Sequence, residues 1–180
     1  IQIAPGVGYT DGEATAQLVL LHNTIVVDEG NAFMDDSSTP GVTVFQNNLV
    51  VNKGSAESGD PCYVANTAAS ATHDHNACYR PQPGDVVLAI EGDGGYVYRS
   101  QALDWEPTVV IDDPLLTDLD GFDWVPATDS PVRQRGVSAG ILTDRNGAPF
   151  ATPPSIGAYE VGVIFSDGFE SGNLSSWGVF

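Results

Sequence analysis

The chain has 180 residues, 42% of them hydrophobic, and a formal net charge of −18 from 24 acidic and 6 basic residues. This length and composition predict one domain with an apolar core and argue against disorder. The charge argues against nucleic acid or an anionic membrane surface as partner, because both are bound through Lys and Arg. It favours a cationic partner such as calcium.

Two matched segments near the start predict the architecture. Residues 18–30 align with residues 42–54 at an offset of 24 (42 − 18), with apolar residues over apolar ones and Asn23 over Asn47. Such a repeat indicates stacked strands, because one unit cannot bury its apolar face without a neighbour. Both faces of the strands are apolar, as expected for parallel strands covered on both sides. We assign Asn23 and Asn47 to structural turns and expect their amides to stack in a ladder.

Residues 55–79 interrupt this repeat, and we interpret them as an insertion. The next strand-like run, residues 86–90, begins 44 residues (86 − 42) after the start of the second unit, which is one repeat plus 20. The chain's two cysteines, Cys62 and Cys78, lie in this insertion, and they predict a disulfide and an oxidising compartment. The run His73-Asp74-His75 favours a solvated loop over a metal site, because no third ligand is fixed by spacing.

Two further strands are predicted before the repeat ends. They cover residues 94–98 and residues 108–112, and the second stops at Asp113-Pro114. Tyr96 and Tyr98 are candidates for stacking on sugar rings, but strand packing is the favoured interpretation. No helix longer than a turn or two is expected.

The rest of the chain carries four motifs in order, at residues 112–116, 129–136, 143–149 and 155–160. This order resembles the C-terminal part of secreted bacterial right-handed parallel β-helix proteins of the choice-of-anchor Q group, whose tails read DPLF, SPAIDAG, TDxxGxPR and DIGAYE. Residues 165–177 are similar to the DGFESG…W ending of many exported proteobacterial proteins. The sequence departs from the family pattern at 132–134, at Phe150 in place of Arg, and at Ser155 in place of Asp.

Repeat and resemblance together predict an all-β fold, a right-handed parallel β-helix (solenoid) with a loop-rich C-terminal cap. We expect coils over residues 1–111 with the disulfide-bracketed insertion at 55–79, a cap over 112–162 and a tail over 163–180. A cap is expected because the open end of stacked strands leaves backbone groups unpaired. It should lie across the last coil, with residues 156–159 as its final short strand.

The sequence offers no catalytic site. The carboxylate pairs Asp35-Asp36 and Asp112-Asp113 lack the His and basic residues that hydrolases or lyases of acidic polysaccharides place beside them. Asp118, Asp120 and Asp123 alternate around a glycine, as in calcium loops, but lack the closing Glu of an EF-hand. We interpret them as a turn, with calcium as the alternative and as the one cofactor to be tested.

We therefore expect a secreted or cell-surface module with a structural or binding role, whose partner is a polysaccharide or another cell-surface component. One alternative is a fragment of a polysaccharide lyase or glycoside hydrolase acting on acidic polysaccharides, and another is a calcium-stabilised adhesive repeat protein. No apolar run approaches the ~20 residues needed to cross a bilayer. The chain begins at Ile1 without an initiator Met or a signal peptide, and we interpret it as a mature product or, in preference, as a C-terminal fragment.

Overall fold

The structure is a computed structural model, and it describes residues 8–9, 19–35, 44–55, 61–65, 72–91 and 95–161. Short strands dominate these residues, with one turn each of 3-10 helix (Arg99–Gln101) and of α-helix (α1, Ala102–Trp105). The strands are β1 (Gly8–Tyr9), β2 (Val19–Leu21), β3 (Thr24–Val27), β4 (Phe33–Asp35), β5 (Val44–Gln46), β6 (Leu49–Asn52), β7 (Tyr63–Ala65), β8 (Thr72–Asp74), β9 (Ala77–Tyr79), β10 (Val87–Glu91), β11 (Gly95–Tyr98), β12 (Leu116–Asp118) and β13 (Asp123–Pro126).

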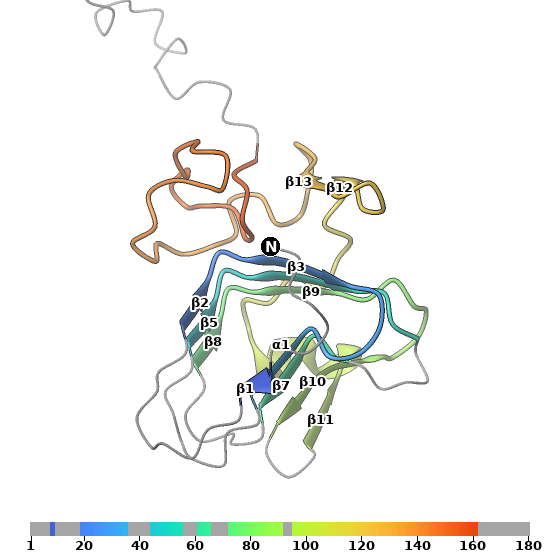
Figure 1. The fold of residues 1–180 in the computed structure, drawn as a ribbon. Coiled ribbons are helices and arrows are strands. Elements are labelled where there is room, and N and C mark those ends of the chain that lie inside the picture. Colours follow the sequence, from blue (N-terminus) through green and yellow to red (C-terminus); the bar gives the residue numbers. More distant parts are fainter. Residues whose placement is uncertain are drawn as a thin grey trace, which may run out of the picture.

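These strands form four separate sheets (Figure 1). Two have three parallel strands each, in the orders β2-β5-β8 and β3-β6-β9. A third has the order β1-β4-β7-β10-β11, in which β11 runs antiparallel to β10, and β12 and β13 form a hairpin. The prediction of an all-β fold is confirmed.

The predicted right-handed parallel β-helix is wrong, because the strands belong to these small separate sheets and form no continuous or closed solenoid sheet in the described residues. Sharp corners explain the separation. His22, Asn47 and His75 take left-handed backbone conformations, with φ of 51°, 56° and 51°, so strand pairing stops at each corner. The antiparallel strand β11 further departs from a parallel array.

The register differs by one residue from the predicted repeat. Val19 pairs with Val44 and Thr24 pairs with Leu49, an offset of 25 (44 − 19 and 49 − 24) rather than 24. Asn23 therefore aligns with Asn48, and Asn47 aligns with His22. The slip moves the predicted ladder onto a different set of asparagines.

The asparagine ladder consists of Asn23, Asn48 and Asn76, each of which follows a left-handed corner. Asn23 Nδ2 donates to Asn48 Oδ1 at 2.9 Å, and Asn48 Nδ2 donates to Asn76 Oδ1 at 3.3 Å. The backbone N–H groups of Asn23 and Asn48 donate to the same two oxygens, at 3.0 and 2.9 Å. Asn47 instead directs its side chain to the C-terminal segment, where Nδ2 donates to the carbonyl of Val137 at 2.7 Å.

Residues 55–79, interpreted from the sequence as an insertion, contain the strands β7, β8 and β9, each of which extends one of the first three sheets. The spacing lengthens here to 28 residues, because Val44 pairs with Thr72 (72 − 44). The predicted disulfide is confirmed: it joins Cys62 and Cys78, whose Cα atoms are 6.0 Å apart. Both cysteines are buried between the sheets.

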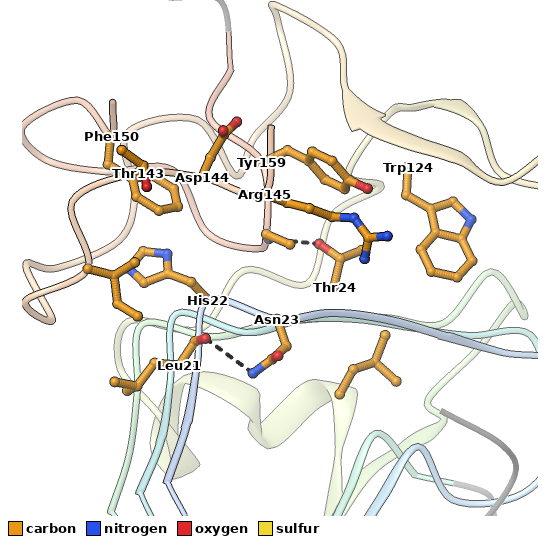
Figure 2. Close-up of a pocket in the computed structure, with 13 residues that line it drawn as sticks. Leu21, His22, Asn23, Thr24, Trp124, Thr143, Asp144, Arg145, Phe150 and Tyr159 are labelled. Carbon is orange, nitrogen blue, oxygen red and sulfur yellow. Dashed lines mark hydrogen bonds between the residues drawn. The ribbon is translucent and has the colours of Figure 1, made fainter. Parts of the chain in front are cut away.

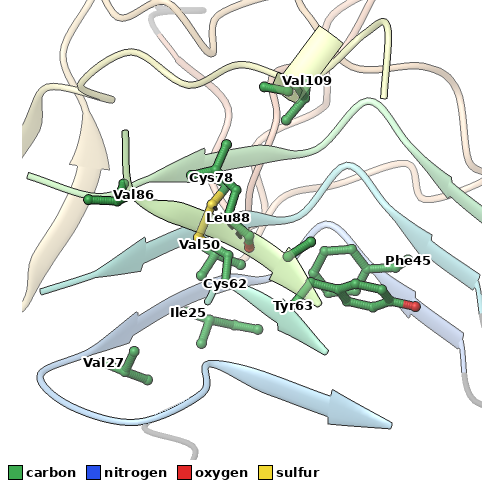
Figure 3. Packing of buried hydrophobic residues seen from close by; sticks show 12 residues of the cluster. Ile25, Val27, Phe45, Val50, Cys62, Tyr63, Cys78, Val86, Leu88 and Val109 are labelled. Carbon is green, nitrogen blue, oxygen red and sulfur yellow. Dashed lines mark hydrogen bonds between the residues drawn. A yellow bond between two sulfur atoms is a disulfide. The ribbon is translucent and has the colours of Figure 1, made fainter. Parts of the chain in front are cut away.

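The inner core lies between the first three sheets, where the disulfide is packed among apolar side chains (Figure 3). Alternate residues of a strand point to opposite faces, so in β3 and β6 the inner core takes Ile25, Val27 and Val50 from one face. Its buried members are Ile25, Val27, Phe45, Val50, Cys62, Tyr63, Cys78, Val86, Leu88, Ala89, Ala102 and Val109.

An outer core covers the opposite face of the β3-β6-β9 sheet. Its buried members are Leu49, Val51, Ala77, Val110, Val132 and Ile156. The last two belong to the C-terminal segment, residues 130–161, which lies beside β3 in Figure 1. Gly157 N donates to the carbonyl of Asn47 at 2.8 Å, and Ala158 N donates to Thr24 Oγ1 at 2.9 Å.

The C-terminal segment is thus positioned against the side of the first two units. The sequence predicted a position across the last coil, and this prediction is wrong. Residues 156–159 form no strand. The short helix α1 lies next to β8 and β10. It contributes Ala102 to the inner core, and its Trp105 packs against the same core. The predicted strand at 108–112 is reduced to a single bridge between Val110 and Ala77.

Two predicted features lie outside the described residues, namely the tail from 163 to 180 and the residue Asp36. None of the helices in the described ranges combines the length and the hydrophobicity that a membrane span requires.

Candidate functional site

A cavity of about 240 Å³ lies between the corner that joins β2 to β3 and the C-terminal segment. Its walls come from residues 21–25, from Trp124 of β13 and from loops within residues 141–159 (Figure 2). Rigid strands supply one wall, and the loops of the other wall are held by buried carboxylates.

His22 is a fixed, neutral part of the wall. Asn47 Nδ2 donates to His22 Nε2 at 2.9 Å, and His22 Nδ1 lies 3.3 Å from the carbonyl of Gly157, which requires the proton on Nδ1. Burial lowers the pKa of His22, although the hydrogen bond to Gly157 and the charge of Glu160 act in the opposite direction. The ring of Phe150 packs against His22 with 4.3 Å between the ring centroids. Because Nε2 accepts from Asn47 and Nδ1 donates to Gly157, both nitrogens of the His22 ring already have hydrogen-bond partners.

Asp144 holds the loop that carries the next part of the wall. One carboxylate oxygen accepts the backbone N–H groups of Asn146 and Ala148, at 2.9 and 2.8 Å. The other accepts the N–H of Glu160 at 3.0 Å. These bonds satisfy backbone donors that have no sheet partner, which gives this acid of the third tail motif a structural role.

Glu160, the acid of the fourth tail motif, acts in the same way. It is buried, and its carboxylate accepts the N–H groups of Ala151, Ser155 and Val161 at 3.1, 3.0 and 3.0 Å. Ser155 Oγ also donates to it at 2.6 Å. Ser155, which stands where the family pattern has Asp, is thus a hydrogen-bond donor to this glutamate.

Aromatic rings and one cation face the remaining space. Figure 2 shows Arg145 extending past Thr24, between Tyr159 and Trp124, with Phe150 at the far side above His22. Trp124 is buried and Tyr159 is half-buried, whereas Arg145 is exposed. Ring faces combined with a few polar groups are typical of sites that bind small polar molecules.

Comparison of the chain with models of protein families, with curated proteins and with solved structures gives no significant match. The resemblance of the tail to the choice-of-anchor Q group therefore stays a prediction, and the geometry of the cavity is the basis for a functional proposal.

The three candidate calcium residues make different contacts, because Asp118 and Asp123 belong to the β12–β13 hairpin and Asp120 pairs with a lysine. Asp118 pairs with Asp123 across the β12–β13 hairpin, and Asp118 Oδ1 accepts the N–H of Gly121 at 2.7 Å. Asp120 lies 3.0 Å from the ammonium of Lys53. Among the described residues, no three acidic, histidine or cysteine side chains form a group that could hold a metal ion. Calcium binding stays a prediction.

His73 lies in β8, and not in a solvated loop as predicted. Its Nε2 is 3.4 Å from Glu91 Oε1, its Nδ1 is 3.3 Å from Glu106 Oε2, and its ring stacks on Trp105 at 4.5 Å. Burial lowers the pKa of His73, but the hydrogen bonds and charges of Glu106 and Glu91 outweigh it and raise the pKa to about 9. His73 is therefore a cation that links β8 to β10 and to the residue after α1.

Sequence reasoning did not identify the cavity. Arg145 and Tyr159 belong to the tail motifs, but no pattern connects them to His22 or to Trp124. Tyr96 and Tyr98 lie in β11, within the predicted strand, where they are 54% and 39% exposed and their ring centroids are 6.4 Å apart.

Proposed function

We propose that this chain is a carbohydrate-binding module of an extracellular or cell-surface protein, and that the cavity beside His22 binds a sugar. The observation that carries the proposal is the meeting of three aromatic side chains, Trp124, Phe150 and Tyr159, with Arg145 in one small cavity. A sugar presents apolar C–H faces and hydroxyl edges, which match ring faces and a multidentate donor respectively.

The hydrogen bonding of the wall supports binding over catalysis. A glycoside hydrolase or a polysaccharide lyase needs an acid and a base that can reach the substrate. The two titratable side chains that the cavity offers for this role, His22 and Asp144, are both engaged in the hydrogen bonds that hold the wall together.

The disulfide supports an extracellular setting, because such bonds persist in oxidising compartments. The net charge of −18 argues against nucleic acid as the partner. A polysaccharide or another cell-surface glycan satisfies both conditions.

The test is a titration of the full chain with a panel of monosaccharides and disaccharides, in which binding is monitored by amide chemical shifts. Binding should move the amides of residues 143–145 and 158–159. Tyr159→Ala should weaken binding by about tenfold, the effect of losing one aromatic contact. The control is Leu103→Ala, which removes a large apolar side chain that is 63% exposed in α1 and lies outside the cavity wall, and it should bind as the wild type does. A panel without any shift at millimolar sugar would overturn the proposal.

A second measurement addresses the enzymatic alternative. The chain is incubated with acidic polysaccharides, and reducing ends and unsaturated products are followed over time. We expect no product above a blank; product formation that Tyr159→Ala abolishes would replace the binding module by a lyase or a hydrolase.

A further inference from the structure

Arg145 differs from most of the other basic residues of the chain in having no protein partner. Lys53 lies between Asp28 and Asp120, at 2.7 and 3.0 Å. Three arginines donate to backbone carbonyls: Arg80, Arg99 and Arg133. Within the described parts of the chain, the guanidinium of Arg145 has no hydrogen bond or ion pair, although the protein carries 24 acidic residues.

The backbone of Arg145 is held firmly while its side chain stays available. Arg145 N donates to the carbonyl of Ala158 at 2.9 Å, and the turn that follows is fixed by the hydrogen bond from Gly147 N to the carbonyl of Asp144 at 3.1 Å. From this anchored position the side chain reaches between Tyr159 and Trp124 (Figure 2). The guanidinium is therefore presented to the cavity by a fixed loop.

The surrounding wall does not oppose an anion at this point. Asp144 directs its oxygens to three backbone N–H groups, and Glu160 is buried behind the wall with its carboxylate fully hydrogen-bonded. His22 is neutral. Arg145 is thus the one charged group of the described wall that is left for a ligand. Its planar fork of N–H donors matches a carboxylate in a bidentate arrangement.

We propose that the cavity takes a sugar that bears a carboxylate, a uronic acid, and that Arg145 binds the carboxylate while the aromatic rings contact the sugar ring. This inference rests on the proposed carbohydrate-binding function and adds the class of sugar. Screening limits the repulsion between exposed charges to about 8 Å at physiological ionic strength, so the distant carboxylates of the protein oppose an anionic ligand only weakly.

The experiment compares matched sugars that differ only at carbon 6, namely glucuronic acid with glucose and galacturonic acid with galactose. Binding to the full chain is measured by amide chemical shifts at neutral pH and physiological salt. We expect at least one uronic acid to bind about tenfold more tightly than its neutral counterpart, the effect of one charge-assisted contact.

Two arginine variants make the test specific. Arg145→Gln should remove the preference for the uronic acid, and Arg145→Lys should retain part of it, because the charge remains and the fork is lost. Arg135→Gln is the matched control: it makes the same change in charge at an exposed arginine outside the cavity, and it should leave the preference intact.

The outcomes separate the two proposals. Equal affinity for acidic and neutral sugars, or a preference that survives in Arg145→Gln, overturns the role of Arg145 and leaves carbohydrate binding in place. Absence of binding for every sugar in the wild type overturns both proposals together.

Discussion

The carboxylate of Glu106 occupies the place of the next asparagine after Asn76. Its Oε1 accepts the N–H of Asn76 at 2.7 Å, and its Oε2 accepts Asn76 Nδ2 at 3.1 Å. Asn76 receives the same pair of donors from Asn48. A carboxylate is a suitable end to such a ladder because it only accepts hydrogen bonds, whereas a further asparagine would leave its own N–H groups without partners. The charge of Glu106, which is 1% exposed, is balanced by His73.

Glu106→Gln should therefore destabilise the fold. The amide places donors opposite Asn76 Nδ2 or His73, and the charge-assisted contacts become weaker or are lost. We expect a loss of about 2 kcal/mol in the free energy of unfolding, measured by urea denaturation. The control is Asp104→Asn, an exposed carboxylate in α1, for which we expect a change below about 0.5 kcal/mol. Equal stability of the two variants would contradict the role given to Glu106.

His73 should give the protein an alkaline stability limit. Its pKa is raised from 6.5 to about 9 in the folded state, so the folded protein holds this proton more tightly than the unfolded chain. The resulting stabilisation is fully present below pH 6.5 and is lost as the pH rises from 6.5 through about 9. Urea midpoints measured across this range should fall in the wild type and stay flatter in His73→Gln. Parallel curves for the two proteins would exclude His73 as the group responsible.

His22 should have the opposite effect. Burial lowers its pKa below 6.5, so the unfolded chain binds the proton more tightly, and the contribution is present above pH 6.5 and lost as the pH falls towards the folded-state pKa. Asparagine is a conservative replacement, because Asn47 takes the same left-handed conformation at the aligned position of the next unit. His22→Asn should show a shallower loss of stability than the wild type between pH 6.5 and pH 5, measured as the shift in melting temperature. A wild-type slope in this variant would argue that other groups titrate there.

The disulfide should contribute strongly to stability. It closes a loop between residues 16 apart in sequence, and chain entropy predicts about 3 kcal/mol for a loop of this size. Replacing both Cys62 and Cys78 by Ala should lower the urea midpoint accordingly. A reductant should lower the midpoint of the wild type and leave the double variant unchanged. A reductant effect on the double variant would show that the reagent acts elsewhere.

The register could not be predicted because the strands are apolar on both faces. A slip of one residue is normally excluded when it carries polar residues into the core. In β6, Leu49 and Val51 are buried in the outer core and Val50 in the inner core, so offsets of 24 and 25 both place apolar side chains in apolar surroundings. The strand content, the disulfide and the use of asparagine at the corners follow from local sequence, and these features were predicted correctly or with an error of one residue.

The cavity could not be predicted because its walls meet through contacts between distant residues. The hydrogen bond from Ala158 to Thr24 joins residues 134 apart, and no periodic pattern marks such a pair. The tail motifs did indicate a structured C-terminal segment. Their acids, Asp144 and Glu160, shape its loops, but only the structure shows that these loops pack beside His22.

Gly157 should be a position at which this packing is sensitive to substitution. Its φ is +105°, and a Cβ there would lie 2.9 Å from Thr24 Oγ1 and 3.2 Å from Leu49 Cβ. Gly157→Ala should therefore disrupt the hydrogen bond from Ala158 to Thr24 and loosen residues 130–161, with faster hydrogen exchange in this segment. Gly140→Ala is the matched control, because Gly140 has a φ of +76° with no atom within 4 Å of the added Cβ, so it pays only the backbone cost of about 1 kcal/mol. If both variants lose the same stability and exchange alike, close packing at Gly157 does not hold the segment in place.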